Sequence, residues 1–354
     1  MPTAFERPPS SLAARGRWAL GAGLAIALLA LVLPRATGVP WASTWSVVSA
    51  VPAIELVALV VLWGLGLLSH TITLTAALPT LTHRRALTLS LTGSAVANVL
   101  PLGGAAGIAL NHRMVRQWGY AAEEFAAFTL ITNIWDVLVK LALPLAVVPV
   151  AALATGTALG GALGPAILAA AVLAAACLLT IVVLARPATA AYAGRLLDRG
   201  ADRALRLTRS SCQARPGQAL VALQARCSSL VRTRWPRLSL GMVLYTALLF
   251  ALMWSCLEAT GAGLTPAAVL AGFAVERLLT LAGLTPGGAG IVEVGLTGAL
   301  LALGGSPTAV VAGVLLYRAL TYGLEIPVGG AGLAMWLWHR HRLPRRCATR
   351  EPGS

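Results

Sequence analysis

Residues 276–296 read ERLLTLAGLTPGGAGIVEVGL, and this stretch decides how the chain can fold. A glutamate–arginine pair begins it, and Pro286 with the glycines that follow interrupts an otherwise apolar run from 264 to 303. Proline and glycine disfavour the interior of a helix, so one straight helix is not expected here. The stretch therefore predicts two helices joined by a break, which together form a hairpin.

The composition of the chain is typical of a membrane protein. Of its 354 residues 58% are hydrophobic and 11% are charged, and the mean hydropathy is +0.80. Soluble domains carry about 25% charged residues, and a spanning helix needs about 20 apolar residues in succession. Apolar runs occur at 18–34, 47–69, 86–110, 125–154, 162–185, 238–257, 264–303 and 309–338. The sequence predicts an all-α polytopic membrane protein.

The basic residues indicate which ends of the helices face the cytoplasm. The formal net charge is +15, and eleven arginines lie in one polar loop, 186–237. Others lie at the N-terminus, on both sides of 86–110 and in the tail HRHRLPRR. Because basic segments stay inside, we expect them and both termini in the cytoplasm, with the protein in the inner cell membrane. The membrane surface accounts for these arginines, so no nucleic-acid partner is expected.

The positions of the breaks predict two related halves. The run 86–110 has arginines on both sides and NVLPLGGAAG within it, which favours a re-entrant hairpin from the cytoplasmic side. The run 264–303 is expected to form a second hairpin that enters from outside. About six spanning helices accompany them, and the order of elements predicts inverted repeats. The layout is a cytoplasmic tail (1–17), a transmembrane domain (18–338, with repeats 18–154 and 162–338) and a second cytoplasmic tail (339–354).

Paired Gly/Pro interruptions in corresponding places of two halves indicate the binding site of a transporter. Helix restarts near 104–108 and 289–292 would aim free N–H groups and positive dipole ends at a bound anion. A lipid phosphate is the obvious anion in a membrane. The alternative is that small residues only allow close helix packing, which explains the matching positions of Pro101 and Pro286 poorly.

Charged residues within the apolar runs add candidates for the site. Asp136 and Lys140 lie four apart on one helix face and can neutralise each other. Further charges gather around the second break and on the last span: Glu276, Arg277, Glu293, Arg318 and Glu325. Charges at membrane depth are costly and commonly functional. The alternative is that acid–base pairs lock helices together without contacting a substrate.

No pattern of residues indicates catalysis, a cofactor or a metal. The five cysteines include no CxxC pair, so neither a disulfide framework nor a zinc site is expected. The chain has no Walker-A, HExxH or GxSxG segment. Ser69 and His70 could form a dyad, but a capping or interfacial role is favoured because no third group is evident.

The basic loop 186–237 has an apolar face at helical spacing in each of its halves. The pattern predicts two amphipathic helices lying on the anionic inner leaflet. An ordinary solvated charged loop is the alternative.

The C-terminal segment LTPGGAGIVEVGLTGALLALGGSPTAVVAGVLLYRALTYGLEIPVG (284–329) resembles the family of the lysylphosphatidylglycerol synthase transmembrane region, also called flippase-like membrane proteins. Its matching residues are Pro286, Gly287, Gly288, Gly290, Glu293, Pro307, Tyr317 and Arg318. In the first half, Asn98, Pro101, the glycines that follow and Asp136 match as well. The similarity covers roughly 18–335.

The sequence also departs from the family pattern. Many members carry an arginine two residues after the first-half proline and then Gly-Glu, where this chain has Gly103, Ala105 and Ala106. Aminoacyl-lipid synthases append a large soluble domain, whereas this sequence ends shortly after Trp338. The resemblance therefore implies lipid translocation, or a related lipid-handling role, without synthase activity.

The favoured hypothesis is a lipid translocator, not an enzyme, that moves an anionic phospholipid, glycolipid or polyprenyl-phosphate head group. Secondary transport of a small anionic solute, and a membrane subunit that docks a soluble partner on 186–237, are the alternatives. Membrane lipids are the expected partners, and a homo-oligomer is left open. The candidate substrate-binding residues are Asn98, Pro101, Gly103, Gly104, Gly107, Asp136, Lys140, Glu276, Arg277, Pro286, Gly287, Gly288, Gly290, Glu293, Tyr317 and Arg318.

Overall fold

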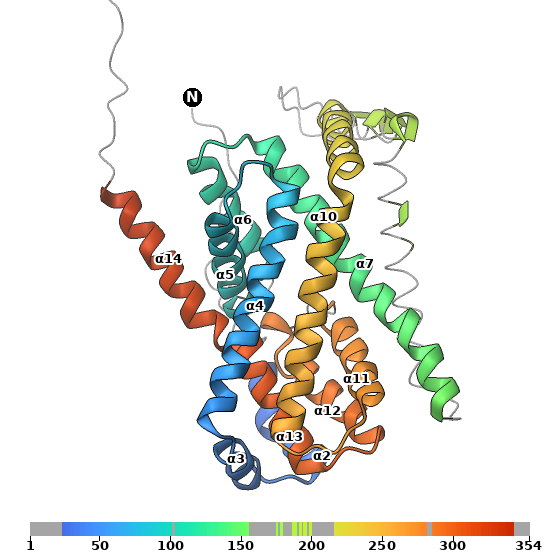
Figure 1. Ribbon diagram of the computed structural model, residues 1–354. Helices are drawn as coiled ribbons and strands as arrows, with labels where there is room; N and C mark the ends of the chain where they lie inside the picture. Colours follow the sequence, from blue (N-terminus) through green and yellow to red (C-terminus); the bar gives the residue numbers. More distant parts are fainter. Residues whose placement is uncertain are drawn as a thin grey trace, which may run out of the picture.

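The computed structural model shows an arrangement of helices, and every regular element among its described residues is helical (Figure 1). The described residues are 23–100, 103–155, 175, 178–179, 186–189, 191–192, 194–196, 198–199, 216–281 and 285–342. This result confirms the all-α fold class.

The chain begins with a sharply bent segment. A π-helical turn η1 (Leu28–Val32) continues into α2 (Leu33–Thr37), and α3 (Trp41–Ser49) follows after a turn. The helix Gly23–Thr37 and α3 meet at 94°. Gly38 makes the turn with a φ of 68°, which an L side chain rarely adopts. The predicted first span, 18–34, is thus extended to Thr37 and followed by a short crosswise helix.

Two long helices, α4 (Ala53–Ala77) and α10 (Pro216–Ala259), lie antiparallel along most of the length of the molecule. Glycines bring them close, since Gly241 of α10 packs on Thr73 of α4. The predicted span 47–69 was wrong in its boundaries. Helix α4 continues past Ser69 to Ala77, and the buried hydroxyls of Ser69 and Thr71 donate to carbonyls of the preceding turn, which satisfies them without water.

Helix α10 also corrects the prediction for the basic loop. Residues 216–237, expected as a separate helix on the bilayer surface, form the first part of the single helix α10. This part packs on the protein, because Cys227 is buried and Arg226 forms an ion pair with Glu124 at 2.6 Å. Most of the other predicted amphipathic helix lies outside the described residues.

The first break separates α5 (His83–Val99) from α6 (Gly103–Gln117). The two helices pack antiparallel, since Gly103 lies against Ala97, and Gly107 lies against Gly93 further from the break. A Cβ at Gly107 would come within 2.7 Å of the Gly93 carbonyl oxygen, so the close packing requires glycine. We call this pair hairpin one.

The second break separates α11 (Pro266–Leu279) from α12 (Ile291–Ala302), with a short 3₁₀ turn η2 (Pro286–Gly288) between them. The glycines of the break have left-handed φ values of 56°, 74° and 86° at 287, 288 and 290. Only glycine adopts these angles readily, which explains the cluster that interrupts the apolar run. We call α11 and α12, with the break between them, hairpin two.

The other described helices complete the membrane domain. They are α7 (Ala122–Thr155), α13 (Pro307–Arg318), the π-helical turn η3 (Ala319–Gly323) and α14 (Glu325–Arg342). Four described helices are long and apolar enough to cross a membrane, or five if the bent pair at the start counts as one. About six were predicted, and the predicted span 162–185 lies almost wholly outside the described residues.

The hairpins occupy opposite halves of the molecule (Figure 1). The end of α5 contacts the second break, because a Cβ at Gly287 would lie 2.7 Å from Asn98 Oδ1, and the Tyr322 hydroxyl of η3 donates to the Asn98 carbonyl at 2.9 Å. One apolar core cluster packs around hairpin two and a separate one packs beside hairpin one. The breaks are therefore joined between two packed halves.

Candidate functional site

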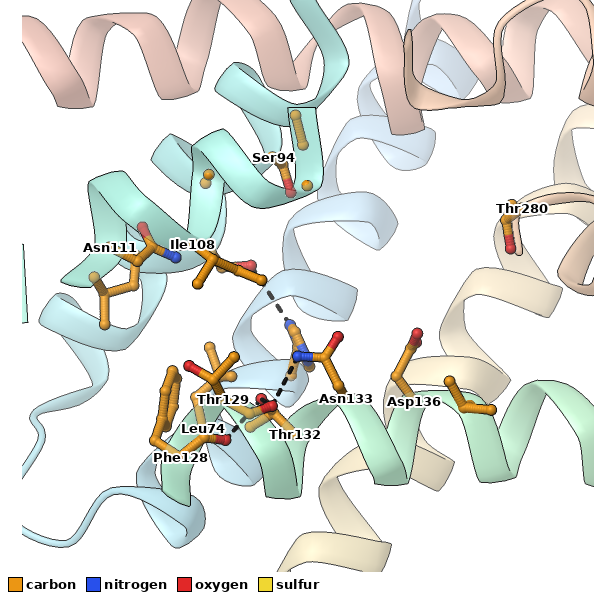
Figure 2. A pocket seen from close by; sticks show the side chains of 18 of the residues that line it. Leu74, Ser94, Ile108, Asn111, Phe128, Thr129, Thr132, Asn133, Asp136 and Thr280 are labelled. Carbon is orange, nitrogen blue, oxygen red and sulfur yellow. Dashed lines mark hydrogen bonds between the residues drawn. The ribbon is translucent and has the colours of Figure 1, made fainter. Parts of the chain in front are cut away.

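A cavity of about 610 Å³ lies beside the junction of the two breaks. Both breaks contribute to its wall, through Asn98 of hairpin one and Gly287 of hairpin two. The remaining wall comes from α4, α5, α6, α7, α10 and the end of α11, and Figure 2 shows side chains from several of these helices around the space.

Hairpin one presents one face of each helix to the cavity. On α5 the lining residues follow helical spacing: Ser90, Gly93, Ser94, Ala97 and Asn98. On α6 they are Gly104, Gly107, Ile108 and Asn111. Small side chains near the break leave the space open, and the polar groups stand where both helices face inward.

Helix α7 carries a polar stripe along the same cavity. Thr129, Thr132, Asn133, Asp136 and Lys140 all line it, and Figure 2 shows the first four in a row along the helix. Asp136 and Lys140 form an ion pair at 2.8 Å, with exposed side-chain fractions of 38% and 16%. This pair is the only described pair of opposite charges on the cavity wall.

Two buried polar atoms of the lining have no hydrogen-bond partner within the described part of the chain. They are Asn111 Oδ1 and Thr129 Oγ1. A buried polar atom left without a partner costs about 1–3 kcal/mol, so such atoms indicate a place for water or a polar ligand. Nearby, His70 stacks on Tyr245 with ring centres 4.6 Å apart, and its Nδ1 lies 3.5 Å from the Ser90 hydroxyl.

A second, smaller cavity of about 140 Å³ adjoins the first and shares Ser94, Tyr245 and Thr280 with it. Its wall carries most of the buried charges, namely Glu276, Arg277, Arg318 and Glu325. We call it the charged cavity.

Glu276 and Arg277 form a closed ion pair between sequence neighbours. Two guanidinium nitrogens of Arg277 donate to the two carboxylate oxygens of Glu276, which has no exposed surface. Arg277 also donates to the Tyr317 hydroxyl at 3.3 Å and lies over the Phe273 ring. Both charges are thus satisfied by the protein itself.

Glu293 and Arg318 hold the second break in place. Arg318 donates to Glu293 Oε1 at 2.7 Å and to the Gly287 carbonyl at 3.0 Å, while the Gly290 N–H donates to Glu293 Oε2 at 2.6 Å. The expectation of free N–H groups at this restart was wrong for Gly290. The carboxylate of Glu293 is tethered three residues away and already occupies the positive helix start.

The amino-acid sequence relates this arrangement to a known family. Residues 18–329 match the lysylphosphatidylglycerol synthase TM region family. The chain belongs to that family. Its members' membrane regions are implicated in lipid handling, and this member is a multi-pass integral membrane protein. No curated protein matches the chain.

In this member of the lysylphosphatidylglycerol synthase TM region family, the predicted site residues fall into three groups. The large cavity is lined by Asn98, Gly104, Gly107, Asp136, Lys140 and Gly287. The charged cavity is lined by Glu276, Arg277 and Arg318. Buried or half-buried outside both walls are Gly103, Pro286, Gly288, Gly290, Glu293 and Tyr317. Pro101 lies outside the described residues.

Sequence reasoning missed several polar residues of the wall: His70, Ser90, Ser94, Asn111, Thr129, Thr132, Asn133, Tyr245 and Thr280. A signal was present on α7, where Thr129, Asn133, Asp136 and Lys140 recur at helical spacing inside an apolar run. The residues considered as a dyad do not form one, because the Ser69 hydroxyl donates to the Gly66 carbonyl at 2.7 Å.

Proposed function

We propose that the protein translocates lipid across the cytoplasmic membrane. The head group of an anionic phospholipid, a glycolipid or a polyprenyl phosphate passes the junction of the two breaks, while its acyl or prenyl chain stays in the bilayer. The observation that carries the proposal is the polar cavity of about 610 Å³ beside the meeting point of two hairpins, within a membrane domain of a lipid-handling family.

The order of the helices supports inverted repeats. In each half a long helix precedes a hairpin and another long helix follows, and the preceding helices α4 and α10 are antiparallel. We propose that hairpin one re-enters from the cytoplasm and hairpin two from outside. Broken backbone at membrane depth is stable only when protein or a water-filled cavity surrounds it, and both breaks satisfy this condition through their mutual contact.

The distribution of arginines supports the orientation. Arg84 and Arg85 begin α5, Arg113 and Arg116 end α6, and Arg226 lies in the first part of α10. These ends lie together in the upper part of Figure 1, and we assign them to the cytoplasm by the positive-inside rule. Their proposed partner is the anionic inner leaflet.

The cavity lies toward this cytoplasmic end. Its wall reaches Asn111, near the basic end of α6, and Phe125 in the first turn of α7. On the other side of the breaks, hairpin two is packed into an apolar cluster that includes Phe273, Leu296 and Tyr317. This asymmetry supports an inward-facing state, in which the path beside hairpin one is hollow and hairpin two is enclosed by packed side chains.

The lining supports a head group with both anionic and hydroxyl oxygens. Lys140 supplies positive charge to a phosphate when its pair with Asp136 opens, and Asp136 can then accept from hydroxyl groups of glycerol or a sugar. Asn111 and Thr129 offer further polar atoms that the protein leaves unpaired. We propose binding and movement of the lipid without chemical conversion.

A reconstitution experiment tests the proposal. Purified protein is placed in liposomes with fluorescent phosphatidylglycerol, and loss of fluorescence to a membrane-impermeant quencher reports movement between leaflets. We expect movement above protein-free liposomes, slowed by Lys140→Met and by Asn111→Leu but not by Glu55→Gln, which alters an exposed acid far from the cavity. No movement of phosphatidylglycerol, a glycolipid or a polyprenyl phosphate, under any imposed gradient, would overturn the proposal.

A further inference from the structure

Among the described acidic residues around the breaks, Glu325 is the one that forms no ion pair with a lysine or arginine. Three pairs account for the others: Asp136 with Lys140, Glu276 with Arg277, and Glu293 with Arg318. Glu325 forms no ion pair with a described residue, although its exposed fraction is 9%. Burying an unpaired carboxylate is costly, so its retention within the membrane domain calls for a functional explanation.

The position of Glu325 connects it with both hairpins. It is the first residue of α14, and its side chain lines the charged cavity together with that of Ser94 on hairpin one. Arg318, on the other side of the π-helical turn η3, donates to the Gly287 carbonyl in hairpin two. The segment from Arg318 to Glu325 therefore links the two breaks through its two ends.

The groups that face Glu325 come from four elements. Hairpin one supplies Ser94, α11 supplies Glu276 and Arg277, α13 supplies Arg318, and α10 supplies Tyr245. Each arginine already binds its own carboxylate. With Glu325 ionised, these pairs leave one negative charge in the charged cavity, and a proton on Glu325 removes it.

A route for that proton is present. The charged cavity shares Ser94, Tyr245 and Thr280 with the large cavity, which we assigned to the cytoplasmic side. Water in a polar cavity of this size can carry protons to a carboxylate in its wall. Glu325 is 9% exposed, so little of its surface is open to water outside this cavity.

We propose that Glu325 is a proton-binding site that couples lipid movement to the transmembrane proton gradient. In this proposal the ionised carboxylate attracts the Ser94 hydroxyl across the charged cavity and holds hairpin one against α14. A proton taken from water forms an O–H bond on Glu325, weakens this charge-assisted attraction and frees hairpin one to move relative to hairpin two. After the movement, the O–H bond breaks and the proton passes to water on the other side.

This inference rests on the proposed lipid movement, and one assay separates the two. Liposomes containing the protein, fluorescent phosphatidylglycerol and a trapped pH-sensitive dye are examined with and without an imposed pH gradient. We expect the gradient to increase the rate of lipid movement in the wild type, accompanied by a pH change inside. In Glu325→Gln the rates with and without the gradient become equal and the pH change is lost, whereas Glu55→Gln keeps both responses.

Each other outcome contradicts one of the two proposals. Lipid movement in the wild type that ignores the pH gradient overturns proton coupling and leaves translocation standing, while absence of any lipid movement overturns translocation itself. A gradient response that persists in Glu325→Gln removes the role of this residue. If that variant does not fold, Ser94→Ala serves instead, and we expect it to shift the pH at which the gradient response is half maximal; an unchanged profile contradicts the proposal.

Discussion

Arg318 contacts three parts of the chain: the start of α12, the second break and the turn η3. It pairs with Glu293 at the start of α12, donates to the carbonyl of Gly287 in the break and lies over the Tyr322 ring. Since Glu293 also accepts from Gly290, these residues fix the geometry of the second break. Their ion pair is buried, so removing one partner leaves an uncompensated charge.

We predict that Arg318→Met destabilises the folded protein by about 3–5 kcal/mol, the usual cost of breaking a buried ion pair from one side. The double variant Arg318→Met with Glu293→Gln recovers much of this loss because no lone charge remains. Arg226→Met is the control, since its pair with Glu124 is 42% and 29% exposed and contributes about 0–1 kcal/mol. Unfolding in detergent measures all three, and equal losses in the two single variants would contradict the assignment.

We predict that Gly287→Ala, although it adds only one methyl group, disrupts the packing of the second break. Gly287 has a φ of 56°, and a Cβ there would collide with the Tyr322 ring and lie 2.7 Å from Asn98 Oδ1. Gly298→Ala on α12 is the matched control, because nothing lies within 4 Å of its Cβ position. We expect Gly287→Ala to lower both thermal stability and lipid movement, while Gly298→Ala preserves both; tolerance of the first change would show that the breaks do not need to touch.

The residues of the break were predictable from sequence, and those of the cavity wall largely were not. Glycines at positive φ must be glycines, so Gly287 and Gly290 were recognisable as a break. Thr129 and Asn111 are ordinary polar residues until the helices that face them are known. Glu293 shows a further limit, because the sequence indicates a buried acid but not whether an arginine or a guest would neutralise it.

At the scale of elements, hairpin one depends on the helix that covers it. Helix α14 crosses α5 at Gly329, where a Cβ would collide with the Leu91 carbonyl oxygen and lie 2.7 Å from the Ala95 Cβ. The approach at this glycine brings the start of α14, with Glu325, toward Asn98 near the break. The packing of two helices thus determines the position of a functional side chain.

We predict that Gly329→Leu separates α14 from hairpin one, whereas Gly330→Leu does not. The two glycines are neighbours, but nothing lies within 4 Å of the Cβ position of Gly330. A large residue in a packed contact typically costs about 1–3 kcal/mol, so we expect Gly329→Leu to lower the unfolding temperature and the gradient response of lipid movement. If both variants behave alike, the contact between α14 and α5 does not position Glu325.

Element boundaries were the least predictable part of the fold. Spanning helices were expected to begin and end where hydropathy changes. The run 47–69 was therefore expected to end at 69, and the helix after the basic loop 186–237 was expected to begin at 238. Helix α4 instead continues to Ala77 with its hydroxyl groups bonded within the helix, and the first part of α10 packs on protein through Leu223, Cys227 and Leu230. The same spacing of apolar residues suits a bilayer surface, so the pattern alone could not distinguish the two.

At the scale of the whole molecule, the side of the breaks at hairpin one is hollow, whereas hairpin two itself is packed in apolar side chains. The large cavity lies beside hairpin one, and the core cluster that includes Phe273 and Leu300 packs around hairpin two. The proposed orientation makes the hollow side cytoplasmic. It can be checked without knowledge of the lipid.

We predict opposite labelling of two exposed serines changed to cysteine in a variant that lacks the native cysteines. Ser229 lies in the first part of α10 and Ser46 lies on α3, at the opposite end of the molecule. A membrane-impermeant maleimide should label Ser46→Cys in intact cells and Ser229→Cys only after permeabilisation. Gly104→Cys, in the cavity wall, should react from the same side as Ser229→Cys. Labelling of both serine positions from one side would overturn the topology.

The contact between Asn98 and Gly287 has a consequence for the energy supply of the cell. In the proposed orientation the contact closes the inner end of the cytoplasmic path and the inner end of the external path, so a lipid entering from either side would be stopped by the opposite hairpin. Opening both entrances at once would require the two hairpins to part completely. If the protein transports lipid as proposed, the meeting of two glycine-rich bends would resist ion leakage and preserve the membrane potential between transport events.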